Sequence, residues 1–236
     1  MEKVVYLLGL GASGAAESDG RDARDARIAL RERLLALAEP LAAAGARRAR
    51  AAVADIDDAR ADASFRLDAH GHGDAAVSLW LDSIDARGPV ERALAGAAAR
   101  CAGYLVTESV PLAPAAGVAP GARIPGVALV TSFDKPAALD DDAFYARWHG
   151  SHTPLSLEIH PLLHYVRNAV VRPLTPGAPP LRAIVSEAVA SVDVIADPAV
   201  FYGSEEGRAR AVADLRTFVD FRSLATALMS EYVLVA

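Results

Sequence analysis

Short apolar runs alternate with longer helical stretches along the first half of the chain. The apolar runs that predict strands are residues 3–10, 47–56, 75–82 and 104–110. A long Ala-, Leu-, Arg- and Glu-rich stretch, residues 24–44, predicts a helix that ends at Gly45. Pro89 suits the first turn of a second helix, which is expected to reach Ala102. The N–H that proline lacks would have no hydrogen-bond acceptor within the helix at that position. The first half therefore has the order β-α-β-β-α-β.

The second half repeats this order of elements. Its predicted strands are residues 127–133, 163–171, 183–195 and 232–235. A helix is expected at residues 141–149, with Asp140 as its N-cap, and another at residues 205–218. Each half thus matches the split βαβ, or ferredoxin-like, arrangement.

Proline and glycine are concentrated between the halves, at residues 109–126, where no helix or central strand is expected. The predicted domains are an N-terminal ferredoxin-like repeat at residues 1–110, a linker at 111–125 and a C-terminal repeat at 126–236. A single ferredoxin-like sheet has helices on one face, so its other apolar face needs a cover. The fold class predicted is α+β, with two repeats that cover each other inside one chain.

Composition narrows the class of protein. The 236 residues are 53% hydrophobic and carry a formal net charge of −6, which argues against binding to nucleic acid. No run approaches the about 20 apolar residues of a membrane span. Glu2 offsets Lys3 before the short first apolar run, which favours a strand over a signal peptide. The single cysteine, Cys101, is interpreted as a small buried hydrophobe in a helical stretch, and we expect a cytoplasmic protein.

Two further motifs have structural interpretations. Residues 9–14 match GxGxxG, but loop-like residues follow where a dinucleotide fold would begin a helix, so a loop is expected. Residues 21–27 (RDARDAR) predict a solvated helix start with ion pairs at i,i+3 spacing.

Four of the six histidines fall between residues 149 and 164. They form one i,i+3 pair and one i,i+4 pair, which a metal could use. Gly150, Pro154 and Pro161 are expected to break the segment, and no cysteine or Glu-x-x-His pattern completes a ligand set, so no metal site is predicted. The other two, His70 and His72, are expected to be solvated turn residues.

The segment from residue 144 to 155 carries the candidate chemistry. Phe144, Trp148 and His152 are spaced by four, so a continuous helix would place them on one face. Two interpretations remain open. His152 is either a core histidine bonded to a backbone carbonyl, or it enters a cleft between the helix and the sheet.

This segment and the strand after it resemble the EthD family. The matching residues are Phe144, Trp148, His152, Pro154, Leu155, Leu162, Tyr165 and Asn168. The resemblance covers residues 126–236 and is weak in the first half, where Ala36 stands opposite His152. It implies a dimeric α+β barrel whose pairing is internal here, so a homodimer is compatible but not required. Relatives act on aromatic polyketides, phenolics and lactone-like compounds, often without a cofactor, and none is expected here.

We hypothesise roles for these residues. His152 is the expected general acid or base, because an imidazole gains and loses protons near neutral pH. Tyr165 is expected to orient the substrate or donate a proton, and Phe144 and Trp148 to wall the pocket. His149 is a weaker candidate.

Arg167 and Asn168 are further substrate-binding candidates, and they lie on opposite faces of one strand. Arg167 shares the side of Tyr165 and would meet an acidic substrate group. Two alternatives to a cofactor-independent enzyme stay open: a non-catalytic small-molecule binder and a haem-dependent barrel enzyme.

Overall fold

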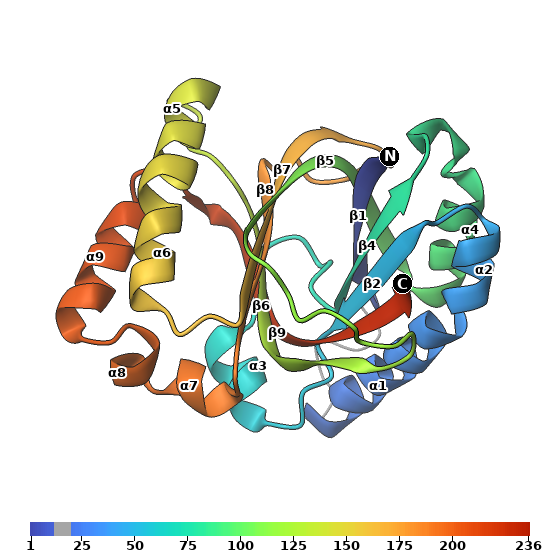
Figure 1. Cartoon of the computed structure of the whole chain (residues 1–236), viewed down its shortest axis with the longest axis horizontal. Helices are drawn as coiled ribbons and strands as arrows, with labels where there is room; N and C mark the ends of the chain where they lie inside the picture. The colour runs from blue at the N-terminus through green and yellow to red at the C-terminus, as the bar shows by residue number, and fades with distance from the viewer. Residues whose placement is uncertain (12–19) are drawn as a thin grey trace.

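The computed structural model describes residues 1–11 and 20–236 (Figure 1). The N-terminal unit contains, in chain order, β1 (Glu2–Gly9), α1 (Gly20–Ala36), α2 (Ala38–Ala43), β2 (Arg48–Val53), α3 (Ala59–Phe65), β3 (Leu67–Asp68), β4 (Ala75–Leu81), the 3₁₀ turn η2 (Ile84–Ala86), α4 (Gly88–Ala97) and β5 (Arg100–Leu112).

The C-terminal unit contains β6 (Arg123–Asp134), α5 (Asp141–Tyr145), the π-helical segment η3 (Ala146–His152), α6 (Thr153–Ile159), β7 (His164–Pro173), β8 (Ala183–Val189), α7 (Val192–Ala196), α8 (Pro198–Phe201), α9 (Glu205–Leu215) and β9 (Asp220–Val235).

Within the described residues, eight antiparallel strands close a barrel in the order β2-β4-β1-β5-β7-β8-β6-β9, and β9 pairs back onto β2. Each unit has the ferredoxin-like order, with its first strand between its third and fourth. The units meet at two seams, β5–β7 and β2–β9. The short β3 adds to β9 outside the closed barrel. The predicted α+β barrel of two ferredoxin-like units is confirmed.

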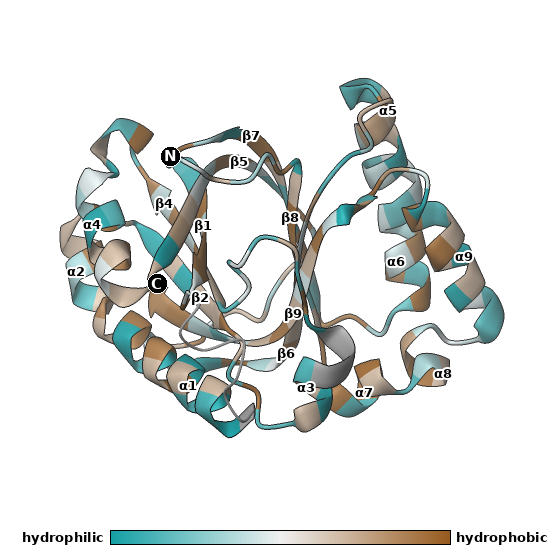
Figure 2. Ribbon diagram, turned by 180° about the vertical axis from the view of Figure 1, so that it is seen from behind, coloured by the Kyte–Doolittle hydropathy of each residue, from teal (hydrophilic) through white to brown (hydrophobic). Residues whose placement is uncertain are grey.

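The helices lie outside the barrel in two groups on opposite sides, α1, α2 and α4 on one and α5, α6, α8 and α9 on the other (Figures 1 and 2). Strand alternation creates this layering. In β1, Val4, Tyr6 and Leu8 pack in the core under the N-terminal helices. Val5 and Leu7 point the other way, into the barrel interior. A third, aromatic core lies between the C-terminal helices and their sheet.

The prediction of no strand across residues 109–126 is wrong at both ends, because β5 continues to Leu112 and β6 begins at Arg123. The register of β5 on β7 shifts between Ser109 and Leu112, and that of β6 on β9 shifts between Ile124 and Ala128. Pro111 and Pro125 lie in these irregularities, where a missing N–H breaks no regular ladder. The domain boundaries themselves stay a prediction.

Other predicted boundaries also change. The helix from Pro89 ends at Ala97 rather than Ala102, because pairing with β1 extends β5 back to Arg100. Cys101 is therefore a strand residue, partly exposed, and burial raises the pKa of its thiol to about 11, so it is mostly protonated at neutral pH.

Four predicted elements, three of them in the C-terminal unit, differ in length. The strand predicted at 183–195 stops at Val189, and α7 follows. The helix predicted to reach residue 218 ends at Leu215, and the last strand begins at Asp220 rather than at residue 232. The long N-terminal helix is divided into α1 and α2. Pro40 lies in the first turn of α2. Helix α3 and strand β3 were not predicted.

The remaining predictions concern the N-terminal charges and histidines. Two of the arginines of residues 21–27 pair across the fold rather than at i,i+3. Arg24 contacts Asp57 at 2.7 Å, and buried Arg27 contacts Asp62 at 2.8 Å and Asp74 at 3.3 Å. Strand β1 is antiparallel to both neighbours, unlike a dinucleotide fold, and residues 12–14 of the glycine motif lie outside the described residues.

His70 and His72 are half-buried rather than solvated. His70 Nε2 lies 3.1 Å from the Ser223 carbonyl oxygen, and His72 Nδ1 lies 2.8 Å from that of His70. No helix of the described chain is long and apolar enough to cross a membrane.

Candidate functional site

One helical rod runs from α5 through η3 to α6. Asp140 caps it, since its Oδ1 accepts a hydrogen bond from the Ala143 N–H at 2.7 Å. The predicted break at Gly150 and Pro154 is wrong. Gly150 lies within η3, whose last turn closes from the Thr153 N–H to the Trp148 carbonyl, and Pro154 lies in the first turn of α6. Such π-helical turns inside α-helices often mark functional sites.

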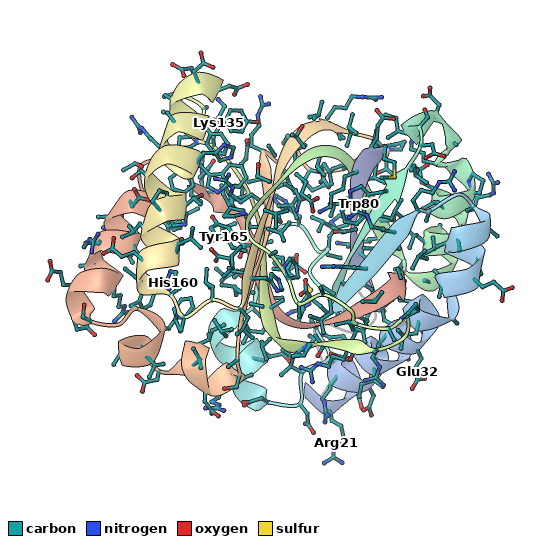
Figure 3. All side chains as sticks on the ribbon, viewed as in Figure 1. Arg21, Glu32, Trp80, Lys135, His160 and Tyr165 are labelled. Atoms are coloured by element: carbon teal, nitrogen blue, oxygen red, sulfur yellow. The ribbon has the colours of Figure 1, made fainter. Side chains whose placement is uncertain are left out.

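This rod and α8–α9 cover a cavity of about 180 Å³ on the outer face of the C-terminal sheet. The lining side chains are mostly apolar or aromatic and come from the sheet, the rod and α8–α9: Leu129, Thr131, Phe133, Trp148, His152, His160, Tyr165, Val185, Glu187, Phe201, Tyr202, Ala211, Leu215, Val219, Phe221, Leu224 and Thr226. Figure 3 labels Tyr165 beside the sheet and His160 near the end of α6. The sequence-predicted His152, Trp148 and Tyr165 therefore border one space.

His152 is held by a carboxylate rather than by a backbone carbonyl. Its Nδ1 lies 2.9 Å from Asp214 Oδ2, and Ser151 Oγ donates to Asp214 Oδ1 at 2.6 Å. The carboxylate needs a donor, so the Nδ1 carries the proton and Nε2 keeps a lone pair. Ser156 Oγ lies 3.3 Å from Nε2. Burial lowers the pKa of His152 and outweighs the opposing effect of Asp214.

Glu187 is the functional candidate that the sequence interpretation missed. It lies on β8, opposite Tyr165 on β7 and Leu129 on β6, so its carboxyl borders the cavity. Burial raises the pKa of Glu187 to about 7, and no described group makes a hydrogen bond to its Oε1. The available signal was an acid placed on the apolar face of an alternating strand, between Val185 and Val189.

Tyr165 is almost fully buried, and burial raises its pKa, so the hydroxyl stays protonated. Its oxygen lies 3.4 Å from Thr153 Oγ1. Arg167 donates from Nη1 to the same Thr153 Oγ1 at 2.7 Å, and its guanidinium carbon lies 6.0 Å from the Trp148 ring centroid. Arg167 does not line the cavity.

The other predicted residues lie outside the cavity. Phe144 is fully buried in the aromatic core, with its ring centroid 5.5 Å from that of Trp148. His149 packs on the same indole from outside, at 4.7 Å between ring centroids. Asn168 faces the barrel interior, where its Nδ2 donates to the Ile184 carbonyl at 3.0 Å.

A haem does not fit this cavity. Pockets for drug-sized ligands have volumes of roughly 300–1,000 Å³, so about 180 Å³ is too small for a macrocycle. Its described lining residues include no Lys or Arg to pair with propionates, and those groups would meet Glu187 instead. Among the described residues, no group of three or more His, Cys, Asp or Glu is arranged for a metal ion.

The corresponding face of the N-terminal unit is packed with aliphatic side chains. Leu30 and Leu34 of α1 and Leu41 of α2 are fully buried against the sheet. The predicted counterpart of His152, Ala36, ends α1. The unit therefore has aliphatic packing where the C-terminal unit has the imidazole and the cavity.

Comparison with known proteins agrees with this architecture. Residues 136–222 match the EthD domain family. No curated protein has a significant match to the sequence. An anthrone oxidase-like protein of known structure has a TM-score of 0.59 and 12% sequence identity, over 99% of this chain and 93% of that one. A proposed monooxygenase from Lactobacillus acidophilus NCFM has a TM-score of 0.50 and 11% identity, over 98% of this chain and 93% of that one.

At such low identities these two structures show the fold alone. The domain match spans the capped rod, Tyr165, Glu187 and Asp214. Five residues that line the cavity lie outside it: Leu129, Thr131, Phe133, Leu224 and Thr226. The chain therefore has a region similar to the EthD domain family at residues 136–222, within an α+β barrel fold that it shares with the anthrone oxidase-like structure.

Proposed function

We propose that this chain is an enzyme that moves protons on a small hydrophobic or aromatic molecule, with His152 and Glu187 as the acid–base pair. The observation that carries the proposal is that an imidazole and a carboxyl with a pKa of about 7 border the same apolar cavity. A catalytic group works best when its pKa lies near the working pH. The described contacts do not explain Glu187 as a structural ion pair.

His152 is the proton acceptor of the pair, and Glu187 is the proton donor. The Nε2 lone pair of His152 accepts a proton from the ligand, and Asp214 stabilises the imidazolium that forms. Protonated Glu187 gives its proton to an oxygen of the ligand, where the electron pair of the broken bond arrives. Tyr165, opposite Glu187 in the sheet, donates a hydrogen bond to the same oxygen. On the ligand, one proton has moved from carbon or oxygen to another oxygen. The cycle closes when the His152 imidazolium releases its proton to water and the Glu187 carboxylate takes one up.

The contact made by His152 favours this function over a non-catalytic binding protein. A histidine bonded only to a backbone carbonyl would be a structural donor. The bond to Asp214 fixes the tautomer of His152 and offsets part of the cost that burial places on its charged form, and both effects favour proton transfer.

Deuterium uptake from heavy water tests the proposal without a known product. Phenolic and cyclic ketone probes are incubated with the protein, and exchange at acidic C–H positions is followed by NMR. The intact chain should exceed the buffer rate. His152→Gln and Glu187→Gln should each lower the protein-dependent rate by roughly 10²–10⁴-fold.

Glu158→Gln is the matched control, because Glu158 lies on α6 but is exposed and pairs with Arg210 at 2.8 Å. It should exchange like the intact chain. If probes bind and raise the melting temperature but no variant changes their exchange, the chain is a binding protein and the catalytic proposal is wrong.

A further inference from the structure

The size of the cavity limits its ligand. An engineered apolar cavity of about 150 Å³ in another protein holds one benzene molecule. The cavity here, of about 180 Å³, therefore has room for one ring and a few substituent atoms. A fused multi-ring compound would require the helical rod to move away from the sheet.

The charge of the cavity sets a second limit. Its described lining residues contain two imidazoles and the Glu187 carboxyl but no Lys or Arg. Burial lowers the pKa of His152 and of His160, whose Nδ1 lies 2.8 Å from the Phe201 carbonyl oxygen, so both imidazoles are neutral at neutral pH. Arg167, the cation expected to meet an acidic group, is bonded to Thr153 instead. An anionic ligand would lose its hydration here without gaining a cation.

Polar groups lie at two ends of the cavity floor. Glu187 and Tyr165 are opposite each other on β8 and β7. Thr131 and Thr226 are opposite each other on β6 and β9, with 3.0 Å between their Oγ1 atoms. Glu187 and Thr131 are diagonal neighbours across β8 and β6, a relation that separates Cα atoms by roughly 7–8 Å.

Apolar side chains lie between these ends, because Val185 pairs with Thr131 and Leu129 pairs with Glu187. The two hydroxyls of the threonine pair share one hydrogen bond between them. They retain one O–H donor and lone pairs for a ligand.

From size, charge and the two polar ends together, we propose that the cavity takes an electroneutral, single-ring compound with oxygen substituents at opposite ends. One oxygen lies between Glu187 and Tyr165, and the other is hydrogen-bonded by Thr131 and Thr226. This inference rests on the proposed function in that it assigns the substrate class of the same cavity.

Trp148 provides a local reporter for the test. The chain has two tryptophans, and Trp80 lies on β4, away from this cavity, so Trp80→Phe leaves Trp148 as the sole indole fluorophore. Dissociation constants are measured from its emission near neutral pH for four probes. They are para-hydroxyacetophenone, acetophenone, para-hydroxybenzoate and the three-ring ketone anthrone.

We expect para-hydroxyacetophenone to bind at least tenfold more tightly than para-hydroxybenzoate and more tightly than anthrone. In the same background, Thr131→Val, which keeps the shape of the side chain, should weaken para-hydroxyacetophenone roughly fivefold and leave acetophenone unchanged. Acetophenone is the control for packing, because it lacks the second oxygen.

Three results would overturn the inference: equal or tighter binding of the carboxylate, tighter binding of anthrone, or no response to any neutral probe up to its solubility limit. These measurements need no turnover, so they separate the two proposals. The expected ranking without deuterium exchange contradicts only the catalytic function. A reversed ranking with exchange retained contradicts only the ligand class.

Discussion

Replacing Glu187 with Gln should remove a pH dependence from the stability of the protein. Burial raises the pKa of this carboxyl from 4.5 to about 7. Between these two values the folded chain binds more protons at this position than the unfolded chain does. The free energy of unfolding therefore falls as the pH rises through this range, because the unfolded chain releases the proton more readily.

The magnitude follows from the size of the shift. One pKa unit corresponds to about 1.36 kcal/mol, so the raised pKa of Glu187 costs the folded state roughly 3 kcal/mol once the carboxyl is ionised. This value is an upper bound, because a carboxyl that borders a cavity keeps some hydration. Glutamine has nearly the same shape and does not ionise, so the variant lacks the whole effect.

Urea unfolding at steps between about pH 5 and pH 8 measures this pH-dependent contribution of Glu187 to the free energy of unfolding. The free energy of unfolding of Glu187→Gln minus that of the intact chain should rise with pH by roughly 2 kcal/mol over this range. The difference cancels the contribution of the buried histidines to the free energy of unfolding, because they titrate in both chains. A difference constant to within about 0.5 kcal/mol would show that Glu187 has an ordinary pKa and would remove the basis for its catalytic role.

Glu158→Gln calibrates the sign of the experiment. The Arg210 guanidinium lowers the pKa of Glu158, so this exposed carboxyl contributes stability above its unfolded pKa and loses it as the pH falls. The pH trend of this variant relative to the intact chain should therefore be opposite in direction and confined to the acid range. The same trend in both variants would mean that the measurement reports something other than the individual carboxyls.

Two further substitutions test the support of the site. Asp214→Asn removes the charge that raises the pKa of His152, so an NMR titration should find that pKa lowered further, with deuterium exchange reduced at least tenfold; an unchanged titration would contradict the role of Asp214. Phe144→Ala should lower the free energy of unfolding by about 3–5 kcal/mol in urea, because its fully buried ring packs among Phe133, Trp148 and Phe218; a loss below about 1 kcal/mol would mean that this core is loosely packed.

The order of elements was predictable because each unit repeats a simple alternation of strands and helices, and two half-covered sheets have few ways to hide their apolar faces. Element ends were harder to predict. Strand β9 begins at Asp220, but Phe221, Arg222 and Ser223 have no strand-like alternation. This part of the strand follows from pairs on either side, Asp220 with Asp134 and Ala225 with Ser132 of β6, which lies far away in the sequence. Helix α4 was predicted to be too long because its alanine-rich sequence favours a helix locally. The residues from Arg100 onward instead form β5, because they pair with β1.

For the site, local spacing was informative but incomplete. Positions four apart brought Trp148 and His152 to the cavity through a continuous rod. Gly150 and Pro154 suggested a break, but Gly150 lies within the π-helical segment and Pro154 lies in the first turn of α6. Asp214 was not predicted, since it is 62 residues from His152 in sequence and meets it only when α9 packs on the rod. Contacts of this kind follow from tertiary structure and carry no local periodicity.

The difference between the two units explains how this chain tolerates such a site. A cavity and an uncompensated buried carboxyl both destabilise a folded protein, the first by lost packing and the second by lost hydration. The N-terminal unit has neither at the corresponding face, where Leu30 and Leu34 pack against the sheet. Because two seams join its strands to the C-terminal sheet, its packing directly supports β7, which carries Tyr165, and β7 in turn pairs with β8, which carries Glu187. A barrel fused in one chain can therefore keep one half as a well-packed scaffold, while the other half holds a reactive cavity that would be harder to stabilise alone.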